Sequence, residues 1–519
     1  MPKIVEQGRK PWANYHGSIN ISSVDLLSYE PEPGDPTDVT AWLRASELAI
    51  RQLLADAKTQ NRQLSTVGAS WSFTPLIGSQ DWLLETEQQA AVFDVPAAQR
   101  VGLKHANLVI VGGGTRLALL NRELEARGYS LRTSGSYSGQ SIAGAIATGV
   151  HGGVMSAGGM QNHVRAMHLV ISPDRSIWLE AASEPVLDDA FALSFATEIL
   201  RDDDVLEAAR VHLGGMGYVN AVLLEVAPLF LCNSHHALRL IDRDWLATMA
   251  SKDFAAIARA QGIADDPYFY ELTLDPFDPF AKPAMHTIYT CSDAAAAMAL
   301  PMDAGKAAQI ETLDLIGAAL AAAMGPAGLD GKAASPPQDI DVPEMVRQDF
   351  AHVPDVRQAS WGAMHGAHVR QYPLYNAAFA IELARLPEAM DIMCATVRDM
   401  LRHFVFTVRI VHNSDGTLAF SRFPDTAVVN LDGAGASVSP VCPLAAAAIF
   451  DALDHHGIDF SLHWGKLGGI TSGKVDRDFG PVGAPGSKLA RWRRARDLLV
   501  PQDMREVLTN DALKQWGLA

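Results

Sequence analysis

The chain has 519 residues, of which 48% are hydrophobic and 19% charged, and its formal net charge at pH 7 is −17. This length exceeds one ordinary hydrophobic core, so we expect at least two globular domains rather than a disordered chain. The negative charge argues against nucleic acid or an anionic membrane surface as a partner, because clustered Lys and Arg bind both.

Residues 36–230 alternate between helical and extended patterns. Apolar spacing predicts an amphipathic helix over 38–58, then a strand over 63–67 and a turn-rich segment, GASWSFTPL. Another strand, over 108–111, enters GGGTRLALLNRELEARGYSL, where leucines at helical spacing share one face. A strand over 163–172 and a glycine turn, LGGMG, before a strand-rich run complete this part.

The segment 135–153, GSYSGQSIAGAIATGVHGG, is dense in Gly, Ser and Thr and almost uncharged. Glycines let the backbone approach a ligand, and successive N–H groups in such turns form nests for phosphate oxygens. An ordinary glycine-rich surface loop is the alternative. A doubly wound dinucleotide-binding domain does not fit, because no GxGxxG follows the first strand and no helix clearly starts from this segment.

The composition changes after residue 228. Long helices and isolated strands, within PYFYELTL, FTVRIV and TAVVNL, predict an α+β substrate domain. Within it, 292–340 is alanine-rich and then rich in Pro and Gly, and we expect its end to be a mobile insertion. We therefore expect a ligand-binding domain over 1–228, a substrate domain over 229–469, and a helical segment over 470–519 that docks back on the first domain.

The cysteines and the apolar segments bear on the compartment. Cys232, Cys291, Cys394 and Cys442 are far apart and form no CxxC pair, so the sequence indicates neither a zinc site nor a disulfide framework, and reduced thiols fit best. No segment has signal-peptide character or the roughly 20 apolar residues of a membrane span. We therefore expect a cytoplasmic protein without a membrane span; the sequence leaves the oligomeric state open.

Five segments together resemble the vanillyl-alcohol oxidase superfamily, whose FAD-binding domain is of the PCMH type, and within it the aldonolactone and alditol oxidase branch. They are WANYHG, GASWSFTPL, GGGTRLALLNRELEARGYSL, GSYSGQSIAGAIATGVHG and HWGK. The resemblance implies an α+β fold, with two subdomains holding FAD and an α+β cap domain built on a large antiparallel sheet.

The resemblance also implies an activity. We expect an FAD-dependent oxidase that moves hydride from a hydroxyl-bearing carbon of a small molecule to flavin N5, with molecular oxygen as the acceptor. Two alternatives remain: a dehydrogenase with another electron acceptor, and a redox-silent or natural-product tailoring flavoprotein.

The resemblance carries a set of FAD-binding positions. The loop 68–73 would hold the pyrophosphate, and Gly217 and Val219 would close around the adenine side. The expected cofactor-binding residues are Val67, Gly68, Ala69, Ser70, Trp71, Ser72, Phe73, Gly114, Gly135, Ser136, Ser141, Gly144, Ala145, Thr148, Gly149, His151, Gly152, Gly217 and Val219.

Two of these positions carry chemical information. In this branch a histidine that bonds covalently to the flavin occupies the position of Trp71, and an indole cannot form that bond, so we expect non-covalent FAD. Core packing is the alternative role for Trp71. At the position of Gly135, relatives that react poorly with oxygen have an alanine, so glycine indicates an oxidase, unless the turn itself requires it.

The substrate side rests on fewer residues. We expect Lys466, His463 and Arg409 to be catalytic, the lysine by stabilising negative charge that develops in the reaction. Thr407 replaces a family glutamate two residues before Arg409, which argues against a polyol substrate. Thr407, Tyr270 and His365 are the expected substrate-binding residues; core or surface packing is the alternative for Tyr270, and His365 is also a candidate general base. His365 and His368 have a metal-like spacing without an acidic partner, so we expect no metal.

Overall fold

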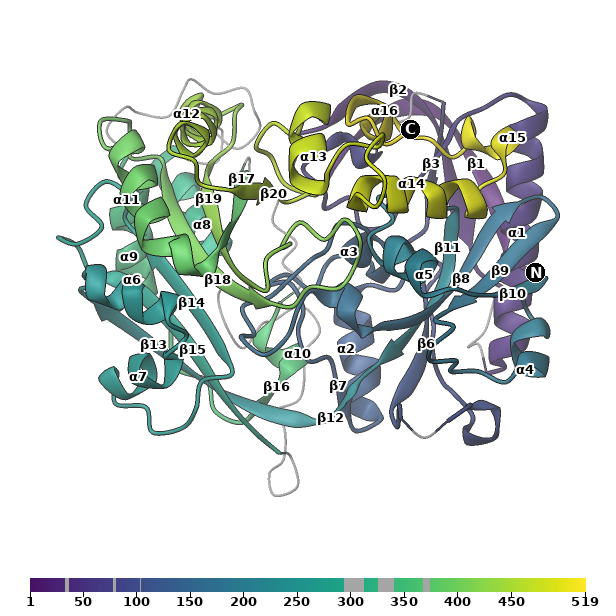
Figure 1. Cartoon of the computed structure of the whole chain (residues 1–519), viewed down its shortest axis with the longest axis horizontal. Coiled ribbons are helices and arrows are strands. Elements are labelled where there is room, and N and C mark those ends of the chain that lie inside the picture. The colour runs from purple at the N-terminus through teal and green to yellow at the C-terminus, as the bar shows by residue number, and fades with distance from the viewer. Residues whose placement is uncertain (33–36, 78–80, 103, 294–311, 325–339, 367–373) are drawn as a thin grey trace.

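The structure is a computed structural model that describes residues 1–32, 37–77, 81–102, 104–293, 312–324, 340–366 and 374–519. The N-terminal half of the chain and a cap formed by the second half lie side by side, and the last helices run along the top of both (Figure 1). No helix in the described part of the chain is long and apolar enough to cross a bilayer.

The N-terminal domain contains two main sheets in its described residues. Helix α1 (Val39–Thr59) begins at Asp38, whose carboxylate accepts hydrogen bonds from the Thr40 and Ala41 amides, and its apolar face joins the core that both sheets share. In the first sheet the strand order is β1 (Lys3–Ala13), β2 (Asn20–Glu30), β4 (Trp82–Glu85), β3 (Leu64–Val67). In the second sheet it is β10 (Glu198–Arg201), β9 (Arg175–Glu180), β8 (Val164–Ser172), β11 (Tyr218–Glu225), β6 (Leu108–Gly112), β5 (Val92–Asp94).

The predicted elements of this domain are present with small shifts at their ends. The expected helix 38–58 is α1, and the expected strands 63–67, 108–111 and 163–172 are β3, β6 and β8. The other elements are α2 (Leu117–Ala126), β7 (Tyr129–Ser130), α4 (Asp189–Leu193), α5 (Asp203–Arg210) and β12 (Ala227–Pro228).

One expectation for the glycine segment was wrong. A short helix, α3 (Ile142–Ala147), starts inside it, immediately after Ser141. Its sequence, IAGAIA, is too short to show a helical period, and its glycine lowers helix propensity, so the pattern concealed it.

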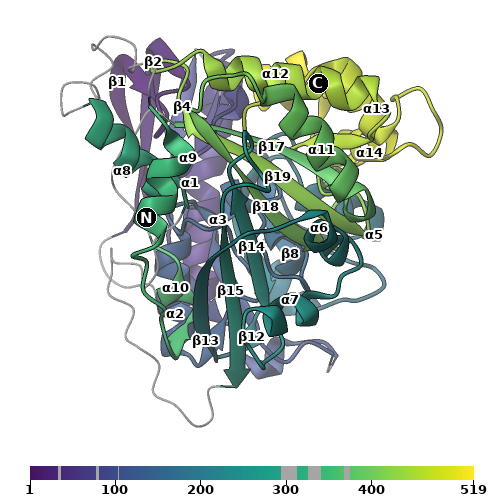
Figure 2. The ribbon, with the colours of Figure 1, turned by 90° about the vertical axis from the view of Figure 1, so that its left-hand side faces the viewer.

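The cap is built on one antiparallel sheet, which has eight strands in the described residues. Helices α11 (Leu386–Val397) and α12 (Val441–His455) pack on its strands, and α6 (Arg243–Ala250) packs on α11 (Figure 2). The strand order is β16 (Ala359–Ser360), β13 (Phe230–Arg239), β15 (Ala284–Asp293), β14 (Phe269–Leu274), β18 (Phe404–His412), β19 (Asp425–Ala434), β17 (Leu374–Glu382), β20 (Phe460–Leu462). The remaining helices are α7 (Phe254–Ala260), α8 (Thr312–Met324), α9 (Val342–Phe350) and α10 (Trp361–Met364). Most of the expected insertion, 294–311 and 325–339, lies outside the described residues.

A disulfide corrects the expectation of reduced thiols. Cys232 on β13 and Cys291 on β15 are register partners and are joined by a disulfide, whereas Cys394 and Cys442 are buried free thiols. A separation of 59 residues hid the pair, because only the pairing of β13 with β15 brings the two positions together. Disulfides are rare in cytoplasmic proteins. The argument from thiols for a cytoplasmic location therefore no longer holds.

The C-terminal helices contact both halves of the molecule. Helix α13 (Ser472–Phe479) packs on β20 of the cap, and α14 (Lys488–Leu499) packs on α5 of the N-terminal domain. The Trp492 indole N–H donates to the Val211 carbonyl at 3.0 Å, and the Asn510 amide donates to the Leu213 carbonyl at 3.2 Å. Helices α15 (Gln502–Arg505) and α16 (Asp511–Gln515) complete this segment.

Candidate active site

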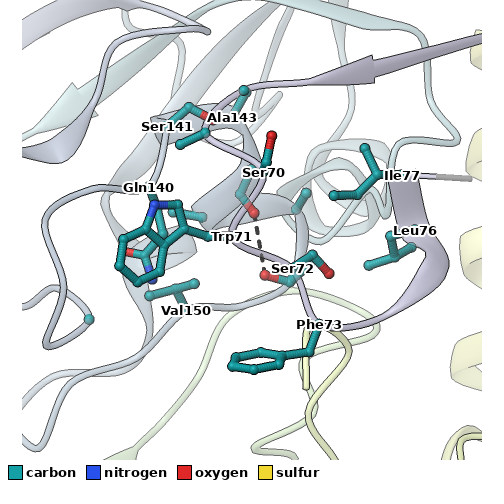
Figure 3. A pocket seen from close by; sticks show the side chains of 18 of the residues that line it. Ser70, Trp71, Ser72, Phe73, Leu76, Ile77, Gln140, Ser141, Ala143 and Val150 are labelled. Atoms are coloured by element: carbon teal, nitrogen blue, oxygen red, sulfur yellow. Dashed lines mark hydrogen bonds between the residues drawn. The ribbon is translucent and has the colours of Figure 1, made fainter. Parts of the chain in front are cut away.

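A long cavity lies between the N-terminal domain and the cap. It encloses about 1610 Å³ of space outside the protein atoms, part of it open to solvent. Segments around residues 66–73, 135–151 and 212–219 form its N-terminal wall, and side chains from β17, β18, β19 and the HWGK turn form its cap wall. Figure 3 shows the loop that carries Ser70 to Phe73 facing Gln140, Ser141 and Val150.

The loop 68–73 and the glycine segment are fitted to each other. A Cβ added to Gly68 would lie 1.9 Å from the Ser141 Oγ, and one added to Gly113 would lie 2.3 Å from the Val219 carbonyl oxygen. Ser70 adopts a left-handed conformation with φ 59°. Turns that contain such a residue direct successive N–H groups to one side and bind anions. These loops therefore bring backbone, rather than charged side chains, to the cavity.

These walls fit FAD. A Cβ added to Gly144 would meet only the Ser141 Oγ, at 3.1 Å, so this glycine leaves room for a ligand close to the backbone of α3. Backbone donors without nearby charges at the N-terminal wall suit the pyrophosphate and adenine of a dinucleotide. Charged groups at the cap wall suit the end at which a redox reaction takes place.

Trp71 lies in an aromatic cluster. Its indole stacks on Tyr15, with ring centroids 4.4 Å apart, and lies 5.0 Å from the Tyr137 ring. A Cβ at Gly139 would lie 2.6 Å from the indole. The indole is thus held by packing on several sides while it lines the cavity.

The HWGK turn joins the two walls. The Phe73 N–H donates to the Gly465 carbonyl at 2.9 Å, and the Thr74 hydroxyl donates to the Trp464 carbonyl at 2.6 Å. Lys466 follows in the cavity and donates to the Asn430 Oδ1 at 3.0 Å. Burial lowers the pKa of Lys466 to about 8, so the ammonium form predominates at pH 7.

Charged groups from adjacent cap strands lie near Lys466. Arg409 on β18 forms an ion pair of 2.5 Å with Glu271 on β14, and Arg409 lines the cavity. Asp432 on β19 lines it too, and burial raises the pKa of its carboxyl to about 6. Near pH 7 the cap wall therefore carries an acidic and a basic group that are both mostly ionised.

Two buried imidazoles line the same region in complementary tautomers. The Nδ1 of His151 is 2.8 Å from the Gly152 carbonyl, which only accepts, so Nδ1 carries the proton and Nε2 is an acceptor in the neutral ring. The Nδ1 of His463 accepts from the Gly465 N–H at 3.0 Å, so its Nε2 carries the proton. Burial holds the pKa of both rings well below the ordinary value, which keeps them neutral at pH 7.

Most of the residues expected at the site line this cavity. All three expected catalytic residues, Lys466, Arg409 and His463, do so. The expected cofactor positions that line it are Val67, Gly68, Ala69, Ser70, Trp71, Ser72, Phe73, Gly135, Ser136, Ser141, Gly144, Ala145, Thr148, His151, Gly217 and Val219.

Six expected residues lie outside the lining. Gly114 does not line the cavity; a Cβ there would be 1.8 Å from the Thr86 carbonyl oxygen, so this glycine allows close packing of the backbone. Gly149 and Gly152 do not line the cavity either. The Tyr270 hydroxyl bonds instead to Trp245 and His286 within the cap. His365 packs on Trp361, and His368 lies outside the described residues. Thr407 reaches the cavity only through Asp432, to which its hydroxyl donates.

Sequence reasoning missed several lining residues of the cap. Asn376, Asn430 and Asp432 lie on β17 and β19, and the sequence around them shows only apolar strand patterns. A polar residue within an otherwise buried strand is the signal that points to them, because unpaired polar groups are rare in a core. Among the described residues, no group of His, Cys, Asp or Glu could hold a metal ion.

Comparison with known proteins gives the same cofactor. A family described as "FAD binding domain" matches residues 43–178. D-arabinono-1,4-lactone oxidase of Eremothecium gossypii is 27% identical over 237 residues, 46% of this chain and 37% of that protein. L-gulono-1,4-lactone dehydrogenase of Mycobacterium tuberculosis is 27% identical over 194 residues, 37% of this chain and 39% of that protein. This chain spans 28% to 39% of the length of such curated relatives.

Solved structures extend the similarity to the whole fold. A cholesterol oxidase from B. sterolicum matches with a TM-score of 0.64 at 14% identity, over 99% of this chain and 97% of that one. A VAO-type flavoprotein from Myceliophthora thermophila matches with a TM-score of 0.56 at 11% identity, over 95% of this chain and 80% of that one. Fold and cavity together define an FAD-binding flavoprotein. The fold is similar to that of PCMH-type FAD-binding flavoproteins of the vanillyl-alcohol oxidase type, and the large antiparallel cap sheet that the sequence led us to expect is present.

Proposed function

We propose that this protein is an FAD-dependent oxidase that acts on a hydroxyl-bearing carbon of a small polar molecule. One observation carries the proposal: Lys466 and Arg409, from the cap, line the same cavity as the FAD-binding loops of the N-terminal domain. Bound FAD would supply the oxidising group for removal of hydride from an alcohol carbon. The relatives named lactone oxidases and lactone dehydrogenases support this reaction class.

The residues of the cap wall would orient the substrate and stabilise charge. An ammonium at Lys466, close to the substrate oxygen, stabilises the negative charge that develops as the hydroxyl proton leaves. His463 offers a proton on Nε2 for a hydrogen bond, and His151 offers an acceptor. Because both rings are neutral and Glu271 neutralises Arg409, Lys466 supplies the positive charge at this wall.

The polarity of the cap wall favours a hydroxylated substrate over a sterol. Asn376, Asn430 and Asp432 line the cavity next to Lys466 and Arg409. Each of these groups has a partner in the protein but uses only part of its hydrogen-bonding capacity, and a steroid ring system would cover the remaining donor and acceptor positions without pairing them, at a cost of about 1–3 kcal/mol for each position left unpaired. An aldonolactone or another compound with several hydroxyls would pair with them.

The test is anaerobic mixing of the purified protein with D-arabinono-1,4-lactone, L-gulono-1,4-lactone and cholesterol. We expect the visible flavin absorbance to bleach with a lactone and not with cholesterol. A colourless protein that cannot be reconstituted with FAD would overturn the proposal. Product formation without bleaching would favour the redox-silent alternative.

We also propose that FAD is bound without a covalent link, because Trp71 occupies the position of the histidine in the related enzymes. Acid precipitation separates the cases, since non-covalent FAD enters the supernatant. Colour that stays in the pellet would contradict this point and leave the reaction class untouched.

We propose oxygen as the electron acceptor, on the basis of Gly135. An alanine Cβ there would lie 2.7 Å from the Val150 Cγ1, so Gly135→Ala is tested together with Val150→Ala, and Val150→Ala alone is the control. We expect the reduced wild-type protein and the control to reoxidise in air within seconds, and the double variant at least tenfold more slowly. Slow reoxidation of all three proteins would favour the dehydrogenase alternative.

A further inference from the structure

A row of polar side chains crosses four neighbouring strands of the cap sheet. Thr407 on β18 is the register partner of Thr273 on β14 and of Asn430 on β19. Two residues further along β19, Asp432 is the register partner of Asn376 on β17. Since side chains two residues apart share a face, Asn430 and Asp432 lie on the same side of the sheet. Asn376, Asn430 and Asp432 all line the cavity.

Asp432 is the buried carboxylate of this row. It is 2% exposed, its carboxylate accepts from the Asn376 amide, and the Thr407 hydroxyl donates to it as well. The Thr407 and Thr273 hydroxyls are 3.2 Å apart, so Thr407 is itself held in place. An ionised carboxylate has about four acceptor positions. Two donors from the protein therefore leave acceptor capacity at a carboxylate that lines the cavity.

A second carboxylate, Glu271, lies two residues before Thr273 on β14 and has a different task. Glu271 is bonded to Arg409 at 2.5 Å and neutralises the guanidinium. Lys466 donates to Asn430 rather than to Asp432, and its positive charge stabilises the Asp432 carboxylate from a distance. A hydroxyl group placed between Lys466 and Asp432 would accept from the ammonium and donate to the carboxylate.

We propose that Asp432 is the residue that selects a polyhydroxylated substrate, by accepting a hydrogen bond from one of its hydroxyl groups. This inference rests on the proposed function. Thr407 has no carboxylate of its own, but its hydroxyl positions the Asp432 carboxylate on β19. The loss of the family glutamate at residue 407 therefore does not exclude a polyol substrate. The ligand class is a polyol or sugar lactone, whose hydroxyls also match the amides of Asn376 and Asn430.

The proposal has a pH signature. Burial raises the pKa of Asp432 to about 6, so the carboxylate is ionised at pH 7 and mostly protonated at pH 5. A group with this pKa loses about tenfold of its ionised form between the two pH values. Affinity for a hydroxylated ligand should fall by about that factor as pH falls from 7 to 5.

The test is calorimetric titration of the dithionite-reduced, FAD-loaded enzyme with xylitol and with D-arabinono-1,4-lactone, since the reduced enzyme cannot turn either over. We expect Asp432→Asn to weaken binding of at least one of them about tenfold at pH 7 and to abolish the difference between pH 5 and pH 7. Asp425→Asn, on the same strand but paired with Lys252 at the surface, is the matched control and should keep the wild-type profile.

A second variant distinguishes a specific effect on binding from misfolding. Thr407→Val removes a donor to Asp432, so the acid limb of binding should move to higher pH while FAD content stays unchanged. The inference is overturned if wild-type enzyme binds either probe and Asp432→Asn binds it with the same affinity and pH profile. If no hydroxylated compound bleaches the wild-type flavin, the proposed function itself fails, which is a distinguishable result.

Discussion

At the scale of single residues, the cap wall combines groups that cost stability with groups that carry the proposed chemistry. Lys466 and Asp432 both have pKa values displaced by burial, in opposite directions, so each is less stable in its charged form than it would be in water. Perturbed groups that converge on one cavity are typical of reaction sites.

Replacing Lys466 should slow the reaction without releasing the cofactor. We expect Lys466→Ala to reduce the rate of substrate-dependent flavin bleaching about a hundredfold or more, because it removes a charge next to the reacting oxygen. Wild-type bleaching should also slow as pH rises through about 8, and the variant should lack this limb. Lys252→Ala, at an exposed lysine paired with Asp425, is the control. Unchanged bleaching in Lys466→Ala would remove the lysine from the mechanism.

Replacing Asp432 should make the fold more stable at neutral pH. A carboxyl whose pKa is raised in the folded state binds more protons folded than unfolded, so its contribution to stability falls as pH rises from about 4 to about 6. A difference of two pKa units between the folded and unfolded states corresponds to about 3 kcal/mol of unfolding free energy. Urea unfolding should therefore show Asp432→Asn more stable than wild type at pH 7 and equal to it near pH 4.

Asp425, near the surface on the same strand, should change the stability of the fold in the opposite direction. Lys252 and His412 hold the pKa of Asp425 below its ordinary value, so its ionised form contributes stability above pH 4 that is lost as pH falls. Asp425→Asn should therefore lower stability at pH 7. A loss of stability in both variants would indicate that Asp432 has a structural role alone.

At the scale of elements, the N-terminal wall of the cavity depends on loops that approach each other within atomic contact. Gly68, at the end of β3, and Ser141, at the start of α3, leave no room for a single methyl group between them. The HWGK turn then fixes this wall to the cap through Phe73 and Thr74. We therefore expect cofactor binding to be sensitive to residues that need not touch the cofactor.

A methyl group at Gly68 should weaken FAD binding. The Cβ of Gly68→Ala would lie 1.9 Å from the Ser141 Oγ, so the two loops must separate, and overpacking of this kind typically costs about 1–3 kcal/mol. Fluorescence titration of the FAD-free protein measures the affinity. Gly473→Ala, in α13 with open space around the added Cβ, is the control and should be neutral or stabilising. Wild-type affinity in Gly68→Ala would show that the loops adjust freely.

The disulfide between β13 and β15 predicts the number of free thiols per chain. In denaturant without reductant, an Ellman assay should detect two thiols per chain, Cys394 and Cys442, and after reduction it should detect four. The double variant Cys232→Ser, Cys291→Ser should give two thiols in both conditions. Four thiols before reduction would show that this pair is reduced in the purified protein.

At the scale of the whole molecule, the cavity is lined by both domains, so the cofactor should couple their stabilities. Ligand that binds only the folded state stabilises it by about 2.7 kcal/mol at a concentration 100 times its Kd. We expect one cooperative thermal transition that FAD moves to higher temperature. Calorimetry that shows two transitions, with only one of them shifted, would contradict this coupling.

The sequence predicted the elements whose structure depends on residues close together in the chain. Helix α1 follows from apolar spacing and an Asp cap, and the loops of the N-terminal cavity wall follow from glycines at which a side chain would clash with a neighbouring segment. Asp432 and Asn376 were missed because their partnership depends on the register between β17 and β19, strands separated by a helix and another strand in the sequence. Tyr270 was misplaced for a related reason: alternation indicates two faces of a strand, but not which face meets the cavity.

The bond between the Phe73 amide and the Gly465 carbonyl has a consequence for biosynthesis. The two ends of this contact leave the ribosome almost 400 residues apart, so this part of the cavity wall cannot close until nearly the whole polypeptide has emerged. At about 5–20 residues per second, the N-terminal domain has tens of seconds to form its sheets before the last piece arrives. Nascent chains stalled before residue 463 should therefore fail to retain FAD, and chains released at full length should acquire it.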